Sequence, residues 1–98
     1  MKKTLFLSVC IALFSLNVNA TEIKEGALYC VSSKKVVKYY NYLEQGYDDY
    51  AKKLMTRSDC FIKGKNEEVI IKSEQKKFVE LELLSGFTIW TKKENIIR

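Results

Sequence analysis

Histidine and proline are both absent from this 98-residue chain, and glycine occurs only four times. Without histidine, the Ser-His-Asp and Cys-His nucleophilic sites are excluded, as is the usual proton shuttle of neutral pH. The scarcity of proline and glycine argues against a disordered or linker-rich chain. No Gly-rich phosphate loop and no calcium-loop spacing occurs in the sequence. We therefore expect neither a cofactor nor a metal ion.

The first 20 residues have the organisation of a secretory signal peptide. Residues 2–3 are lysines, residues 5–16 form a short apolar run, and residues 18–20, Val-Asn-Ala, fit a signal-peptidase site. We expect cleavage between Ala20 and Thr21. An N-terminal membrane anchor is the alternative, but the apolar run is shorter than the ~20 residues that a spanning helix needs. The sequence thus predicts a periplasmic or secreted protein.

Cysteine is also scarce, with three residues in the whole chain. Removing 20 residues from 98 leaves a mature chain of 78, which retains Cys30 and Cys60. So short a chain gains little stability from burial alone, and an even cysteine count in a small exported domain predicts a disulfide. In the chain-entropy model this bond contributes about 3.5 to 4 kcal/mol. A reactive or metal-binding thiol pair is the alternative, but the spacing is not that of CxxC and no histidine could complete a zinc site.

Positive charge exceeds negative charge only mildly. The chain has 17 basic and 12 acidic residues, and without Lys2 and Lys3 the balance is 15 against 12, a mature net charge of +3. This excess is too small for a nucleic-acid-binding protein. Adjacent lysines occur at 34–35, 52–53, 76–77 and 92–93, which is typical of a solvated surface. We expect no nucleic-acid partner, whereas weak attraction to an anionic cell-wall polymer stays open.

Apolar periodicity predicts helices in the middle of the mature chain and strands on both sides. A helical spacing of apolar residues up to Gly46 predicts a helix over 34–45 with Ser33 as its cap. Asp48 is the predicted cap of a second helical segment that ends near 57–59. The predicted strands are 27–31, 60–63, 68–72, 78–83 and 87–91. The order is one strand, a helical insertion and a four-strand antiparallel meander.

A meander this short must curl to cover its own apolar face. The prediction is a single α+β, mostly β domain over 21–98, with a small SH3-like barrel of about five antiparallel strands and a helical insertion between strands 1 and 2. The sequence from Cys60 to Ile97 resembles bacterial SH3-like domains of small exported proteins. The segments that carry this resemblance are Asp59-Cys60, Val69-Ile70-Ile71, Val79-Glu80-Leu81 and Thr88-Ile89-Trp90-Thr91. The resemblance leaves residues 34–57 unmatched and implies a binding module without a particular ligand.

Tyrosines crowd the predicted helical region. A tyrosine ring supplies rigid contact area while its hydroxyl finds a polar partner, so a face with several tyrosines suits a protein or glycan ligand. Tyr40 shares the apolar face of its helix and is a predicted core residue. The predicted binding residues are Tyr39, Tyr42, Tyr47 and Tyr50. The alternative is that these tyrosines only pack the insertion against the barrel.

The acidic residues Glu44, Asp48 and Asp49 form the one local group that suits acid–base chemistry. Adjacent acids at a helix start more often serve as a cap and compensate the helix dipole. We therefore name no catalytic residue and expect the protein not to be an enzyme.

The combined observations favour a non-enzymatic, extracytoplasmic interaction protein that binds a partner protein. Small inhibitors and immunity proteins of bacterial envelopes have this size and build, which is an analogy of fold and compartment. A cell-wall or surface-polymer binding module is the alternative function, and a small secreted enzyme or toxin ranks below both.

Overall fold

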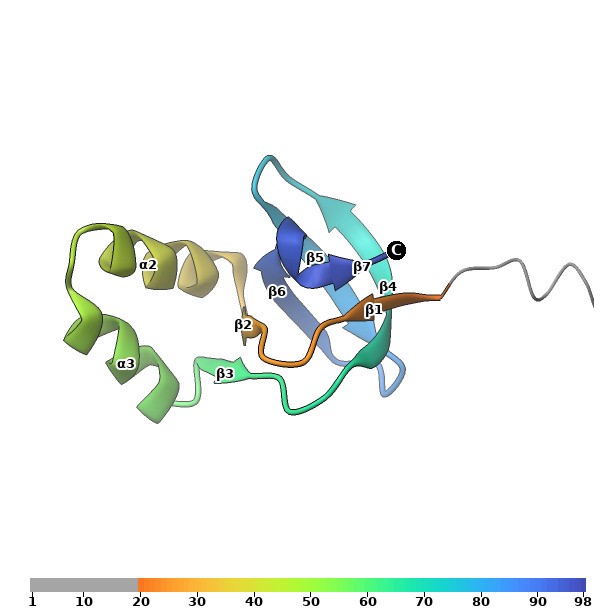
Figure 1. Cartoon of the computed structure of the whole chain (residues 1–98), viewed down its shortest axis with the longest axis horizontal. Coiled ribbons are helices and arrows are strands. Elements are labelled where there is room, and N and C mark those ends of the chain that lie inside the picture. The colour runs from red at the N-terminus through yellow and green to blue at the C-terminus, as the bar shows by residue number, and fades with distance from the viewer. Residues whose placement is uncertain (1–19) are drawn as a thin grey trace, which may run out of the picture.

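The computed structural model describes residues 20–98 (Figure 1), so the predicted signal peptide, apart from Ala20, lies outside the described residues. Two helices follow the second strand, and five further strands and a short 3-10 turn complete the chain. The elements in chain order are β1 (Thr21–Ile23), β2 (Leu28–Cys30), α2 (Ser33–Glu44), α3 (Asp48–Thr56), β3 (Cys60–Ile62), β4 (Glu67–Glu74), β5 (Phe78–Leu83), β6 (Thr88–Lys92), η1 (Lys93–Asn95) and β7 (Ile96–Ile97). Neither described helix has the length and apolar character that crossing a membrane requires. The predicted α+β, mostly β class is confirmed.

The strands form one seven-stranded sheet in the order β3-β2-β6-β5-β4-β1-β7, and every neighbouring pair is antiparallel. The prediction of about five strands was wrong because the predicted strands begin at residue 27 and end at residue 91, whereas β1 pairs with both β4 and β7. The helical insertion consequently lies between the second and third strands. The edge strands β3 and β7 do not pair with each other, so the sheet is open and the predicted barrel is not confirmed.

The predicted four-strand meander is also incorrect in its first strand. β3 pairs with β2, in the register Cys30↔Cys60, and not with β4. The physical reason is the helical pair, whose two ends return to the same place and bring the flanking strands side by side (Figure 1). The meander therefore consists of β4, β5 and β6.

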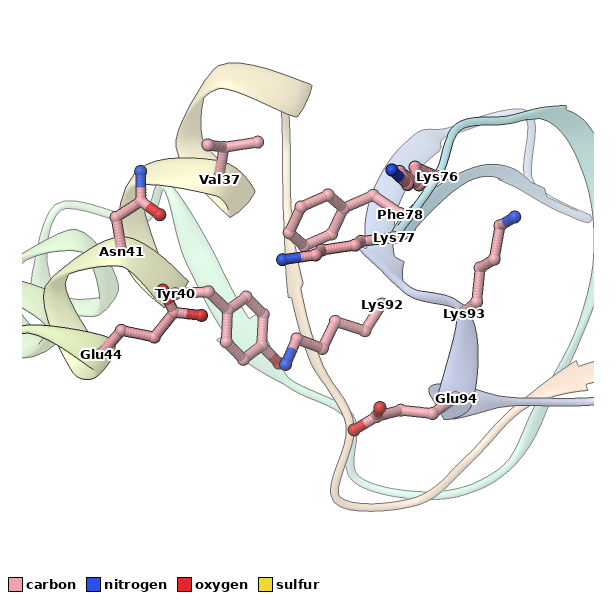
Figure 2. Close-up of a pocket in the computed structure, with 10 residues that line it drawn as sticks. All are labelled: Val37, Tyr40, Asn41, Glu44, Lys76, Lys77, Phe78, Lys92, Lys93 and Glu94. Carbon is pink, nitrogen blue, oxygen red and sulfur yellow. The ribbon is translucent and has the colours of Figure 1, made fainter.

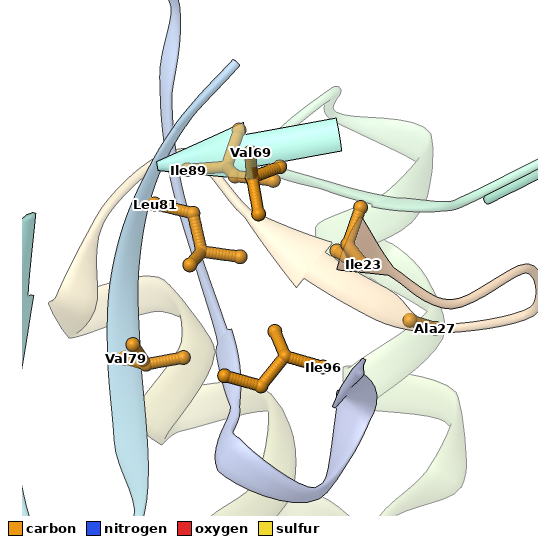
Figure 3. Close-up of a cluster of buried hydrophobic side chains, with 7 residues drawn as sticks. All are labelled: Ile23, Ala27, Val69, Val79, Leu81, Ile89 and Ile96. Carbon is orange, nitrogen blue, oxygen red and sulfur yellow. The ribbon is translucent and has the colours of Figure 1, made fainter. Parts of the chain in front are cut away.

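One face of the curled sheet encloses an apolar cluster that we call the sheet core (Figure 3). Alternation along β5 explains its position, because Val79 and Leu81 point inward and are fully buried while Glu80 and Glu82 lie on the other face. The register shift of β4 between Ile71 and Ser73 is a bulge, which bends a strand and helps the sheet to curl. The sheet core consists of Ile23, Ala27, Val69, Val79, Leu81, Ile89 and Ile96.

The outer face of the same sheet carries a second cluster, the helix–sheet core, under α2 and α3. Val36 of α2 and Leu54 of α3 are buried in it. Its members are Leu28, Cys30, Val36, Leu54, Cys60 and Phe78. The predicted disulfide between Cys30 and Cys60 is present and joins β2 to β3 where the helical pair leaves the sheet. The bond therefore closes the loop that contains both helices.

Candidate functional site

The turn between the two helices determines where the predicted binding tyrosines lie. Gly46 has a φ of 81°, in the left-handed region that glycine adopts without strain. Its N–H donates to the Leu43 carbonyl at 3.1 Å, and the Tyr47 N–H donates to the Tyr42 carbonyl at 2.8 Å. This pair of bonds is a Schellman motif, which turns the chain back towards the last turn of α2. The predicted helix stop at Gly46 is confirmed, and α3 begins beside the end of α2.

Three of the four predicted tyrosines meet at this end of the helical pair, which we call the tyrosine tip (Tyr42, Tyr47 and Tyr50). The ring centre of Tyr50 lies 5.5 Å from that of Tyr42 and 5.7 Å from that of Tyr47. Tyr47 and Tyr50 are each 51% exposed, whereas Tyr42 is half-buried against the helix–sheet core. The tip thus offers two accessible rings supported by a third.

Tyr39 is not part of the tyrosine tip. It is half-buried, packs against the helix–sheet core and meets the ring of Tyr40 edge-on at 5.3 Å. Tyr40 packs against the same core, as its helical spacing predicts. The tyrosine-rich segment therefore divides into residues that hold the helices on the sheet and residues that face solvent.

Charged groups of both signs surround the accessible rings. A hollow of about 660 Å³ is lined by Tyr47 and Tyr50 together with Asp48, Asp49 and Lys53. The Lys53 ammonium lies 5.3 Å from the centre of the Tyr50 ring, at cation–π distance. Tyr50 also lines a smaller groove of about 230 Å³, together with Lys38, Tyr42, Lys53, Leu54 and Arg57. The tip can therefore contact a partner through aromatic, acidic and basic groups at once.

The carboxylates of this region are dispersed. Glu44, Asp48 and Asp49 are all exposed, and Glu44 lines a different cavity from the two aspartates. Asp48 does not cap α3 as predicted, because Tyr47 occupies the cap position and makes no side-chain cap bond. Asp48 and Asp49 lie in the first turn, where acidic side chains stabilise a helix dipole. Ser32, and not Ser33, caps α2 by accepting a bond from the Lys35 N–H.

Another cavity, the lysine cleft, lies between α2 and one end of the sheet (Figure 2). It has a volume of about 560 Å³. One side has two lysine pairs, Lys76 and Lys77 just before β5 and Lys92 and Lys93 where β6 meets η1, and α2 contributes the opposite wall (Figure 2). The lining residues are Val37, Tyr40, Asn41, Glu44, Lys76, Lys77, Phe78, Lys92, Lys93 and Glu94.

Backbone and ring contacts fix the shape of the lysine cleft. The Lys93 N–H donates to the Lys77 carbonyl at 3.0 Å, which holds the two lysine pairs beside each other. The Phe78 ring is only 8% exposed and lies 6.0 Å from the Tyr40 ring, and the Lys92 ammonium lies 4.3 Å from the Tyr40 ring centre. Burial raises the pKa of the Tyr40 phenol above its ordinary value. The cleft combines an aromatic floor with a basic rim.

Sequence reasoning missed the lysine cleft because it treated all four lysine pairs as solvated surface. The pairs at 76–77 and 92–93 are distant in sequence, and only the pairing of β5 with β6 brings them together. The sequence did contain a usable signal. The predicted antiparallel pairing of strands 78–83 and 87–91 places the start of the first strand beside the end of the second.

No protein-family model, curated protein or solved structure matches this chain.

Proposed function

We propose that this chain is an extracytoplasmic, non-enzymatic interaction protein that binds a partner protein through the tyrosine tip. The observation that carries the proposal is the exposure of Tyr47 and Tyr50, each 51%, at the turn between two anchored helices. Tyrosines are enriched at protein interfaces because they bury a large rigid ring at small entropic cost and still offer a hydroxyl. Supported by Tyr42, the two rings form a compact aromatic patch of the kind that dominates binding energy.

The anchoring of the helical pair supports the same proposal. The Cys30–Cys60 bond closes the loop that contains α2 and α3, and buried Val36 and Leu54 hold the helices on the sheet. A binding surface held in one conformation loses less entropy when it binds. A disulfide persists in oxidising compartments, so together with the predicted signal peptide it supports a periplasmic or secreted location.

We further propose that the curled sheet is a variant of the SH3-like fold, with the β4-β5-β6 meander as the shared element. Small inhibitors and immunity proteins of bacterial envelopes are the functional class that this size and build favour. That step is an analogy, since a fold does not define a function.

A cell-wall polymer is the second candidate ligand of the tip. The cations beside its rings support it, because Lys38, Lys53 and Arg57 share a groove with Tyr42 and Tyr50. Such a site would stack sugars on the rings and attract anionic groups, and salt would weaken its binding.

The test is affinity capture from an envelope extract of the source organism, with the mature chain and a Tyr47→Ala/Tyr50→Ala variant as baits. Phe87→Ala is the matched control, since Phe87 is a 56% exposed aromatic in the β5–β6 turn. We expect the tip variant to lose a protein that the parent and the control both retain. Recovery of the same proteins by all three baits contradicts the proposal, and salt-sensitive retention on purified peptidoglycan that the tip variant loses selects the polymer instead.

A further inference from the structure

We propose that the lysine cleft is a second binding site, which accepts an acidic peptide segment with an apolar side chain between its carboxylates. The cleft shares α2 with the tyrosine tip but none of the tip's tyrosines lines it. This inference therefore goes beyond the proposed function and does not depend on it.

The first argument is uncompensated charge. Lys93 pairs with Glu74 at 3.7 Å, and Lys92 lies over the Tyr40 ring. Lys76 and Lys77 have no carboxylate within ion-pair distance among residues 20–98, and both are exposed. Two adjacent ammonium groups are thus available to anionic groups of a ligand.

The second argument is the apolar floor. Phe78 and Tyr40 form the base of the cleft, and Val37, which is 37% exposed, lies on the wall formed by α2 (Figure 2). Ligand sites typically combine such apolar lining with a few placed polar groups in volumes of roughly 300 to 1,000 Å³, and the cleft measures about 560 Å³. A ligand that uses both rim and floor must carry anionic and apolar groups together.

The third argument separates a peptide from a uniform polyanion. Glu44 and Glu94 also line the cleft, so a polymer with evenly spaced phosphates would place some of them beside like charge, whereas a peptide can set its carboxylates at the lysines and its neutral backbone at the glutamates. Their carboxylates can accept hydrogen bonds from the backbone N–H groups of a bound peptide, and the Asn41 side chain can both donate and accept. A peptide segment supplies such groups between its side chains. Lining groups of both signs therefore favour an acidic peptide of a partner protein.

The experiment uses the oxidised mature chain and a fluorescent probe peptide, Glu-Asp-Phe-Glu-Asp with blocked ends, in an anisotropy titration at physiological salt. The cleft variant is Lys76→Gln/Lys77→Gln. The matched control is Lys24→Gln/Lys65→Gln, which has the same net charge as the cleft variant. It removes two exposed lysines that lie outside the cleft lining and have no ion pair within residues 20–98.

We expect the parent to bind the probe, the cleft variant to bind it about tenfold more weakly, and the control to match the parent. A probe with serine in place of phenylalanine should bind several-fold more weakly because it leaves the floor uncovered. Equal weakening by the two lysine variants, absence of binding to the parent, or tighter binding of polyphosphate than of the probe overturns the inference. The Tyr47→Ala/Tyr50→Ala variant should bind the probe like the parent, so failure of the tip proposal remains distinguishable from failure of this one.

Discussion

The curled sheet and the helical pair are stabilised in different ways. The sheet core has seven buried members, of which Ile23, Val79, Leu81 and Ile89 are fully inaccessible. Even its buried polar residue is satisfied, since Thr91 donates to the Leu28 carbonyl at 2.7 Å and accepts from Asn95. The helices instead bury only Val36, Ala51 and Leu54 and have a covalent bond at their base.

This difference separates a stable sheet from a helical pair that carries the exposed rings. The exposed rings of Tyr47 and Tyr50 belong to the turn between α2 and α3 and the first turn of α3. That turn lies at the end of the helical pair away from β2 and β3, the strands that the disulfide joins (Figure 1). The sheet provides the platform, and the disulfide restricts the arm that carries the tyrosine tip. Regions with few buried contacts open at lower free energy than a core, so the two regions should differ in local stability.

The largest expected effect comes from removing the covalent bond. The Cys30→Ala/Cys60→Ala variant should lower the free energy of unfolding by about 3.5 to 4 kcal/mol, because it releases the closed loop in the unfolded state. Urea unfolding monitored by circular dichroism measures this change. A loss well under 1 kcal/mol would mean that burial alone holds the helical pair.

A core substitution in each region sharpens the comparison. Leu81→Ala should lower the free energy of unfolding by ~3 kcal/mol and raise hydrogen exchange throughout the chain, because it opens a cavity in the sheet core. Leu54→Ala should raise hydrogen exchange mainly in α2 and α3, because Leu54 is a member of the helix–sheet core. Equal loss of protection in β5 in both variants would show that the sheet and the helices unfold as one unit.

A backbone change at the tip should have a smaller effect. A Cβ at Gly46 would meet nothing within 4 Å, so Gly46→Ala adds no steric clash with the rest of the fold. It should lower the free energy of unfolding by ~1 kcal/mol, because alanine must adopt a left-handed conformation there. Urea unfolding should detect this loss, and exchange should rise near the tip before it rises in the sheet. A neutral outcome would show that the turn relaxes into another conformation without penalty.

The smallest effect concerns pH. Because burial raises the folded-state pKa of Tyr40, the folded protein holds this proton more tightly than the unfolded chain. The resulting stabilisation is complete below the ordinary tyrosine pKa of about 10 and is lost as pH rises through the folded-state value. Tyr40→Phe should flatten the alkaline part of the stability curve, and it should remove a phenol that titrates above pH 10 in an absorbance titration. An unchanged curve and titration would contradict the burial of Tyr40 at the sheet–helix contact.

The sequence predicted local features well because local physics determines them. Gly46 after an apolar helical repeat and the alternation of Val79, Glu80 and Leu81 each produced the predicted structure. The predicted mature segment contains two cysteines, so only one intramolecular disulfide could form, and that bond is present.

Long-range pairing could not be predicted in the same way. β1 and β7, of three and two residues, were missed because their segments show no apolar run or alternation like those that predicted β2 and β3. The pairing of β3 with β2 depends on helices that return to their starting point, and the lysine cleft depends on the register of β5 and β6. Sequence reasoning identified the tyrosines of the tip, but separating accessible Tyr47 and Tyr50 from packed Tyr39 required the tertiary structure.

The most direct test of a tyrosine tip that contacts a partner is site-specific photo-crosslinking in the envelope of living cells. A photoreactive phenylalanine analogue is placed at position 47 in one variant and at position 87 in the other, both of which are exposed aromatic sites. We predict a discrete crosslinked protein from position 47 and none from position 87. Crosslinks from position 87 alone, or identical products from both positions, would contradict the role of the helical pair as the binding arm.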